Sequence, residues 1–262
     1  MIMYCFVTVV DIEARRTYMI RFIIAAIFIV IFLLISLILQ PIMLLVGLFS
    51  RHARDVASLA IVNWAFRVVI LIAGTKLTVI GLENVPKDEP VLYILNHRSL
   101  LDIVISYTLV PRPTGYVAKK EMGKYLTLTW WMKLLYCELL DRKDMRAGLK
   151  TMNRCAERIE SGISMAICPE GTRNKTNEPM LEFHKGSFKI AEKSNCKIVP
   201  VVLNNTSAIF EDHLPFLKKQ HVIIEYLPPV DVAAMDREAR RSLAEMVREQ
   251  MIPVYLKNQE LI

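Results

Sequence analysis

The feature that most limits the fold of this chain is an apolar run near its N-terminus. Residues 22–39 are eighteen consecutive positions without a charge, and Ser36 is the only polar residue among them. At about this length a helix in a bilayer becomes a better interpretation than a helix in a protein core. Gln40-Pro41 interrupts the run and residues 42–49 continue it, which predicts a long, kinked helix embedded in a membrane. A cleaved signal peptide is the weaker alternative, because no small-residue cleavage site follows the run.

A second apolar stretch covers residues 56–73, but it contains Asn63 and Arg67 and also fits an interfacial or buried helix. Basic residues lie on both sides of the first segment and give no inside–outside bias across it. This favours a helix pair that dips into one leaflet and returns, with a true span as the alternative. Either way, the rest of the chain is expected on the cytoplasmic face of the membrane. The flanking basic residues are Arg15, Arg16 and Arg21 before the segment and Arg51, His52 and Arg54 after it.

Composition narrows the classes of partner and site. The net charge of +7 fits an anionic partner, such as a membrane surface or a phosphorylated substrate. We expect no nucleic-acid partner, because the chain has no RNP-type aromatic motif and no zinc-finger spacing. The cysteines are scattered and odd in number, which predicts neither a disulfide framework nor a zinc site. They are Cys5, Cys137, Cys155, Cys168 and Cys196.

The remaining chain alternates short apolar, β-branched runs with segments of helical periodicity. This pattern predicts an α/β domain with a largely parallel sheet flanked by helices, over residues 76–262. Residues 1–75 are then membrane-anchoring helices. The expected strands are residues 91–95, 115–118, 163–168, 197–203 and 221–226, and the expected helices are 145–159, 188–193 and 236–256, the last broken at Pro253.

Polar clusters follow three of the expected strands where each strand ends. His97 follows the first, Lys119 and Lys120 follow the second, and residues 170–173 follow the third. Because the carboxyl ends of parallel strands share one edge of a sheet, where ligands bind, we expect these clusters to form one site.

His97 and Asp102 are five residues apart, a spacing that does not place two side chains on one face of a helix. The pair can meet if His97 lies on a loop and Ser99 caps a new helix with Asp102 in its first turn. The alternative is structural: Ser99-x-x-Asp102 is a capping-box pattern, and a lone loop histidine has no necessary function. Acyl transfer to an alcohol gives the pair a purpose, because neutral imidazole accepts the hydroxyl proton and a carboxylate orients the ring.

The other two clusters suit an anion. Glu170-Gly171-Thr172-Arg173 offers a flexible glycine, a hydroxyl and a guanidinium that can hold a phosphate with two hydrogen bonds. Lys119 or Lys120 can add a point charge. The alternative for each is a solvated surface charge, and no glycine pattern of a nucleotide-binding loop is present.

Together these motifs resemble those of the glycerolipid acyltransferases, most closely the 1-acylglycerol-3-phosphate (lysophosphatidic acid) acyltransferases. The resemblance covers residues 76–230. The matching segments are Asn96 to Asp102 (Asn-His-x-Ser-x-x-Asp), Lys119 to Glu121 with Asp141-Arg142, Pro169 to Arg173 (Pro-Glu-Gly-Thr-Arg), Phe183 to Gly186 (Phe-x-Lys-Gly) and Val199 to Val201 (Val-Pro-Val).

The resemblance implies roles for these residues. His97 is then the general base on the sn-2 hydroxyl of lysophosphatidic acid, and Asp102 orients it. Arg173, with Lys119 or Lys120, holds the phosphate, and Glu170 shapes that site. The donor is acyl-CoA or acyl-carrier protein, the product is phosphatidic acid, and neither a cofactor nor a metal is expected.

Three alternatives stay open at this point. Residues 121–141 contain one glycine, Gly123, where the family usually has a proline and several glycines, so the acceptor can be another lysolipid, such as a lyso-ornithine lipid or a lysophospholipid. The chain can also be a catalytically silent membrane-binding homologue. A metal site at His97 and Asp102 is the third alternative, with only two candidate ligands. Trp130 and Trp131 fit interfacial anchors as well as an acyl-chain environment.

Overall fold

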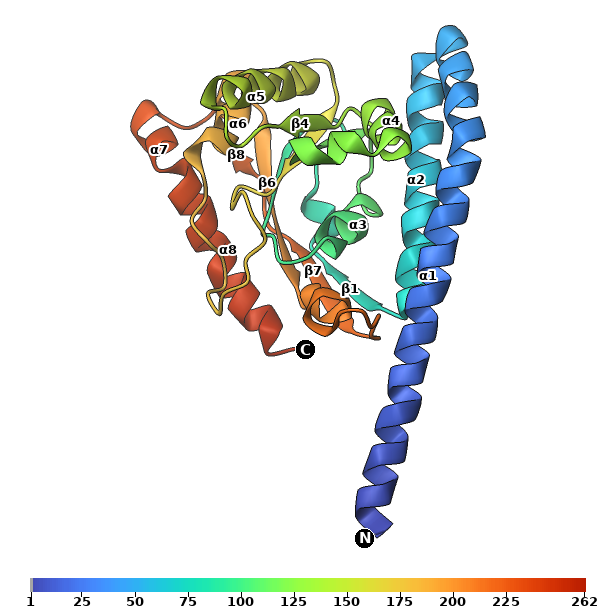
Figure 1. Ribbon diagram of the computed structural model, residues 1–262. Coiled ribbons are helices and arrows are strands. Elements are labelled where there is room, and N and C mark those ends of the chain that lie inside the picture. The colour runs from blue at the N-terminus through green and yellow to red at the C-terminus, as the bar shows by residue number, and fades with distance from the viewer. Residues whose placement is uncertain (1) are drawn as a thin grey trace.

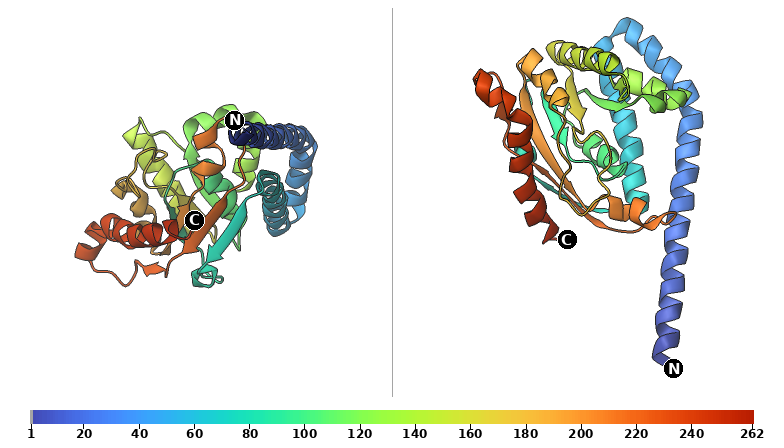
Figure 2. Two further views of the ribbon diagram at one scale, coloured as in Figure 1. Left: turned by 90° about the horizontal axis from the view of Figure 1, so that it is seen from below. Right: turned by 60° about the vertical axis from the view of Figure 1, so that its left-hand side comes forward.

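The computed structural model describes the backbone of residues 2–262 and the side chains from Glu13 onward. Its centre is a sheet with the strand order β1-β7-β6-β2-β5-β3-β4, and β8 pairs with the other end of β6 (Figures 1 and 2). Only the β6–β7 and β6–β8 pairs are antiparallel, so the predicted largely parallel sheet is confirmed. The strands are β1 Lys76–Ile80, β2 Leu92–Leu95, β3 Thr114–Lys119, β4 Glu138–Leu140, β5 Ser164–Ile167, β6 Lys197–Asn204, β7 His221–Tyr226 and β8 Val230–Asp231.

Helices cover both faces of this sheet (Figure 2). The α-helices are α1 Ile2–Phe49, α2 Arg51–Ala73, α3 Leu101–Tyr107, α4 Leu126–Leu134, α5 Met145–Glu160, α6 Lys189–Ser194, α7 Arg237–Arg241 and α8 Leu243–Gln259. Five 3-10 turns connect them: η1 Leu82–Asn84, η2 Lys120–Lys124, η3 Lys185–Phe188, η4 Ser207–Ile209 and η5 Glu211–His213.

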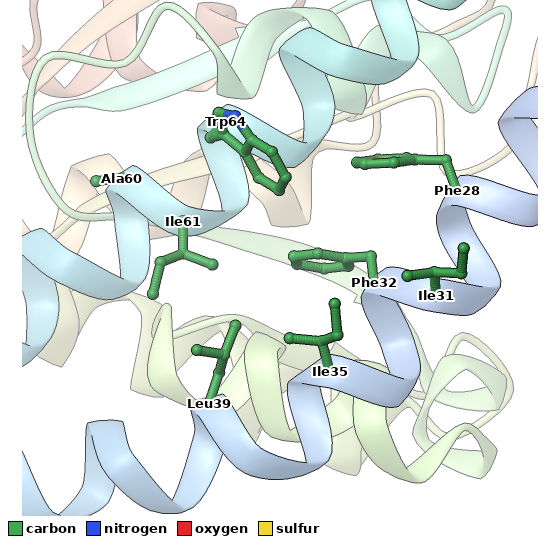
Figure 3. Close-up of a pocket in the computed structure, with 8 residues that line it drawn as sticks. All are labelled: Phe28, Ile31, Phe32, Ile35, Leu39, Ala60, Ile61 and Trp64. Carbon is green, nitrogen blue, oxygen red and sulfur yellow. The ribbon is translucent and has the colours of Figure 1, made fainter.

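The first two helices form an antiparallel pair beside the α/β domain, and the N-terminal part of α1 extends past it (Figure 1). Ser50 separates them and caps α2, since its side chain accepts a hydrogen bond from the Ala53 N–H. Both helices are long and apolar enough to cross a membrane, as judged by length and composition. An open groove of about 450 Å³ lies between them (Figure 3). Its lining is entirely apolar: Phe28, Ile31, Phe32, Ile35 and Leu39 of α1, with Ala60, Ile61 and Trp64 of α2.

The polar residues that interrupt the apolar run hold α1 against the domain. Ser36 Oγ accepts a hydrogen bond of 2.8 Å from Trp131 Nε1, and Gln40 Nε2 donates one of 2.7 Å to the Thr127 carbonyl. Phe32 stacks on Trp131, with 6.1 Å between ring centroids. Trp131 is 3% exposed, so the alternative that it is an interfacial anchor is wrong.

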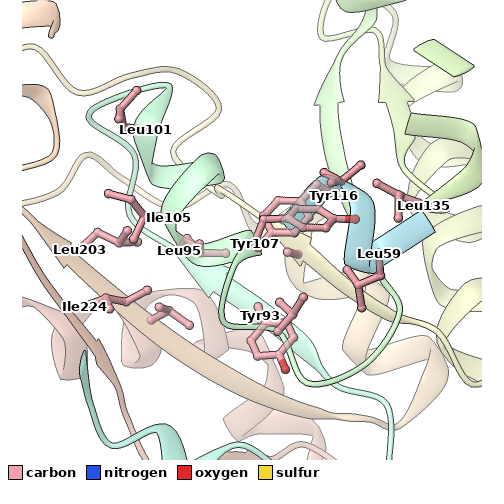
Figure 4. Close-up of a cluster of buried hydrophobic side chains, with 14 of the residues drawn as sticks. Leu59, Tyr93, Leu95, Leu101, Ile105, Tyr107, Tyr116, Leu135, Leu203 and Ile224 are labelled. Atoms are coloured by element: carbon pink, nitrogen blue, oxygen red, sulfur yellow. The ribbon is translucent and has the colours of Figure 1, made fainter. Parts of the chain in front are cut away.

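The sheet separates two hydrophobic cores. Along β2, Tyr93 and Leu95 pack toward α2, α3 and α4 (Figure 4), whereas Leu92 and Ile94 pack toward α5, α6 and α8. Successive residues of a strand point to opposite faces, so this four-residue strand contributes to both cores. A strand buried on both faces has an unbroken apolar sequence, which is why it was recognisable.

The helix predicted over residues 236–256 was expected to break at Pro253, and the position of that break is wrong. The chain breaks at Ser242, between α7 and α8, and α8 continues through Pro253. A proline inside a helix removes one backbone hydrogen bond. Here burial of Val247, Met251 and Tyr255 against the sheet keeps the segment helical.

Candidate active site

The end of strand β2 is tied to its neighbour through one side chain. Asn96 Oδ1 accepts a hydrogen bond of 2.8 Å from the Leu203 N–H, and Asn96 Nδ2 donates one of 2.9 Å to the Leu203 carbonyl. Asn96 is fully buried, so this pairing also satisfies its amide. The loop that carries His97 therefore begins from a fixed point on β6.

The backbone of His97 is held on both sides by the segment that follows β5. Its N–H donates to Glu170 Oε1 at 2.6 Å, and its carbonyl accepts from the Asn174 N–H at 2.7 Å. Glu170 Oε2 accepts from the Leu181 N–H at 2.8 Å. Burial raises the pKa of the Glu170 carboxyl, and these backbone donors oppose that shift. Glu170 thus supports the His97 loop, and both of its oxygens point to backbone donors.

Asp102 lies in the first turn of α3, and its carboxylate is directed back to the preceding loop. Oδ2 lies 2.9 Å from His97 Nδ1 and accepts hydrogen bonds from the Arg98 and Ser99 N–H groups at 2.7 and 2.8 Å. Oδ1 accepts a further bond from Thr206 Oγ1. The Ser99 contact is the capping-box interaction, so one carboxylate serves both the helix start and the histidine. The cap position itself is Leu100, one residue later than expected.

The second ring nitrogen of His97 is available. No residue from Glu13 onward forms a hydrogen bond to Nε2, and the side chain is 17% exposed. A hydrogen on Nδ1, shared with Asp102, leaves a lone pair on Nε2. Within the same described part of the chain, no three His, Cys, Asp or Glu side chains gather as metal ligands would.

Arg173 lies beside the same loop. Its Nη1 is 3.1 Å from Glu211 Oε1, and Glu211 also accepts hydrogen bonds of 2.7 Å from Ser99 Oγ and from the Leu100 N–H. The guanidinium side chain is 45% exposed, so it faces solvent at this edge of the sheet. The structure thereby brings the 170–173 cluster and the His97–Asp102 loop together.

The two lysines lie further along the edge, at the end of β3, which is separated from β2 by β5. Lys119 Nζ is 3.4 Å from Glu121, and Lys120 Nζ is 2.8 Å from Asp141. Both side chains are more than half exposed. In the described structure no hydrogen bond or ion pair joins either lysine to Arg173 or His97.

The backbone conformation explains why the Glu-Gly-Thr-Arg run has a glycine at position 171. Gly171 adopts φ +69°, and a Cβ there would lie 2.9 Å from the His184 ring. Thr172 is exposed and forms no hydrogen bond among the described residues. Burial raises the pKa of the Cys168 thiol well above its ordinary value, which agrees with a cysteine of the core and not with a nucleophile.

Two residues of the site were missed from the sequence. Thr206 and Glu211 belong to the loop after β6, more than 100 residues from Asp102 and Ser99, which they contact. Neither belongs to a motif with a recognisable spacing. Only the pairing of β6 with β2 brings this loop to the His97 edge.

Comparison with known proteins identifies the family. A family model described as "Acyltransferase" matches residues 76–204. The chain is 32% identical over 189 residues to the 1-acyl-sn-glycerol-3-phosphate acyltransferase of Saccharomyces cerevisiae, covering 71% of this chain and 62% of that protein. Residues 76–204 therefore belong to the acyltransferase family. The resemblance predicted from the motifs is thereby confirmed.

Other relatives agree. The 1-acyl-sn-glycerol-3-phosphate acyltransferase of Borreliella burgdorferi is 27% identical over 186 residues, covering 71% of this chain and 74% of that protein. The crystal structure of the LPA acyltransferase PlsC from Thermotoga maritima superimposes with a TM-score of 0.74 at 22% identity, covering 91% of this chain and 98% of that one. This chain therefore shares the PlsC fold. It spans less than two thirds of the length of the yeast relative.

We predict that Gly171→Ala disturbs the site through the backbone. The strained φ and the approach to His184 should cost about 1–3 kcal/mol and lower the midpoint of thermal unfolding. Gly186→Ala is the matched control, because a Cβ there meets nothing within 4 Å. Equal unfolding midpoints for the two variants would contradict the inference that position 171 requires a glycine.

Proposed function

We propose that this protein transfers a fatty acyl group to the sn-2 hydroxyl of 1-acylglycerol-3-phosphate and so forms phosphatidic acid. The observation that carries the proposal is the His97–Asp102 pair, with an available Nε2, beside Arg173 at one edge of the sheet. An imidazole base and a guanidinium at one site suit an acceptor that carries both a hydroxyl and a phosphate. The yeast and Borreliella burgdorferi relatives are named for the same acceptor, 1-acyl-sn-glycerol-3-phosphate.

In the proposed reaction His97 Nε2 takes the proton of the sn-2 hydroxyl as its oxygen attacks the thioester carbonyl of acyl-CoA or acyl-carrier protein. The carboxylate of Asp102 stabilises the imidazolium that forms. The tetrahedral intermediate then breaks its C–S bond, and the departing thiolate takes the proton from Nε2. The products are an ester and a thiol. A thioester is already activated, so this route needs neither an enzyme nucleophile nor a cofactor.

The phosphate of the acceptor is assigned to Arg173 and the Thr172 hydroxyl, on the turn that Gly171 allows through its positive φ. Lys119 and Lys120 supply positive charge further along the edge; to reach the phosphate they must leave Glu121 and Asp141. Glu170 supports this site indirectly, through the His97 backbone.

We further infer that residues 1–75 anchor the protein to a membrane and residues 76–262 carry the reaction. From Glu13 onward, most large apolar side chains of α1 are exposed on the protein surface, which favours contact with membrane lipids. Because α4 packs against α1, the domain then lies at the lipid surface where the acceptor resides. We assign the domain to the cytoplasmic face from the flanking basic residues.

The purified protein, given radiolabelled acyl donor and a panel of lysolipids, should acylate lysophosphatidic acid best. His97→Ala should remove turnover because no base remains, while flotation with anionic vesicles is unchanged. His52→Ala, an exposed histidine of α2, is the matched control. Lysophosphatidic acid as the poorest acceptor would contradict the substrate assignment, and substantial turnover by His97→Ala would remove His97 from the mechanism.

Arg173→Ala should chiefly weaken acceptor binding. Loss of a guanidinium–phosphate interaction predicts a KM for lysophosphatidic acid raised by roughly 10- to 100-fold, measured by steady-state kinetics at fixed donor. Arg237→Ala on α7 removes an exposed arginine outside the site and serves as the control. A change confined to kcat would argue against a phosphate clamp.

A further inference from the structure

Glu211 joins the two halves of the site. One carboxylate oxygen accepts from the Leu100 N–H and contacts Arg173 Nη1, and the other accepts from Ser99 Oγ. Its side chain is only 18% exposed, although Arg173 reaches into solvent. Neither the family motifs nor the spacing of the sequence points to this residue.

The contact leaves most of the guanidinium free. Arginine has five N–H donors in a planar fork, and Glu211 is the only described residue that bonds the Arg173 side chain, through Nη1. The other donors remain for an anion. An exposed ion pair contributes little to stability, so the effect of Glu211 is to fix the direction of a long, flexible side chain.

The segment that carries Glu211 is in turn held by α1. The ring of Phe210, the preceding residue, stacks on Phe22 with 5.7 Å between centroids and 15° between planes. The Leu217 N–H donates to the Tyr18 carbonyl at 3.4 Å. Lys218 Nζ lies 5.7 Å from the centroid of the Tyr18 ring. Phe22 is the first residue of the uncharged apolar run.

We propose that Glu211 is a positioning residue that aims Arg173 at the acceptor phosphate, and that the Phe22–Phe210 contact holds Glu211 in place. This rests on the proposed function, because it assigns Arg173 to the phosphate. The membrane helix thereby supports the acceptor site through side-chain contacts, in addition to anchoring the protein.

A double-mutant cycle tests the proposal with the full-length protein. Glu211→Gln keeps the size of the side chain and removes its charge, so the KM for lysophosphatidic acid should rise about tenfold with kcat changed less than about threefold. In an Arg173→Ala background the same substitution should change KM no further. Phe210→Leu should raise KM in the same direction, and Asp212→Asn, on the same 3-10 turn, should leave both constants unchanged.

Three outcomes would overturn the proposal: a wild-type KM in Glu211→Gln, a loss confined to kcat, or an equal increase in KM with and without Arg173. Failure of the proposed function is seen separately, as a wild-type protein that does not acylate lysophosphatidic acid. In that case the double-mutant cycle is measured as the affinity for glycerol 3-phosphate, by calorimetry on the full-length protein in detergent. Independent effects of the two substitutions on that affinity would overturn the role of Glu211 as well.

Discussion

The buried carboxylate of Asp102 accepts hydrogen bonds from the His97 ring, from the Arg98 and Ser99 N–H groups and from the Thr206 hydroxyl. These donors come from the loop after β2 and from the loop after β6. A buried carboxylate is tolerated only when its oxygens are satisfied in this way, so the arrangement of the whole loop is coupled to it. The direction of the His97 ring follows from the same contacts, and the proposed chemistry depends on that direction.

The surrounding structure supports this contact from three sides. Asn96 fixes the start of the loop to β6, Glu170 and Asn174 hold its backbone from the β5 side, and Glu211 holds its far end. The β6 side is connected to α1 through Phe210, and α4 is connected to α1 through Trp131. The apolar helix pair and the polar site that contains His97 and Arg173 are thus parts of one packed unit.

Much of this was predictable from local patterns. The central strands were recognisable because both of their faces are buried, and α5 because Met152, Ala156 and Ile159 recur at helical spacing. Strands β4 and β8 have three and two residues, too few to form a pattern. In the site, the His97–Asp102 geometry followed from a loop and a helix start, whereas Thr206 and Glu211 depend on tertiary contacts across the sheet. The contact between Ser36 and Trp131 also depends on tertiary structure, and the sequence around neither residue predicts it.

The most direct test of the account is the turnover of Asp102→Asn, which keeps the shape of the side chain and removes its charge. Asp144→Asn is the matched control, because Asp144 also accepts two backbone hydrogen bonds at the start of a helix, α5, away from the site. We expect kcat to fall by roughly 10²- to 10⁴-fold in Asp102→Asn, with a folded protein and little change in the KM for lysophosphatidic acid. A kcat within about threefold of wild type would contradict the claim that Asp102 orients His97 for catalysis.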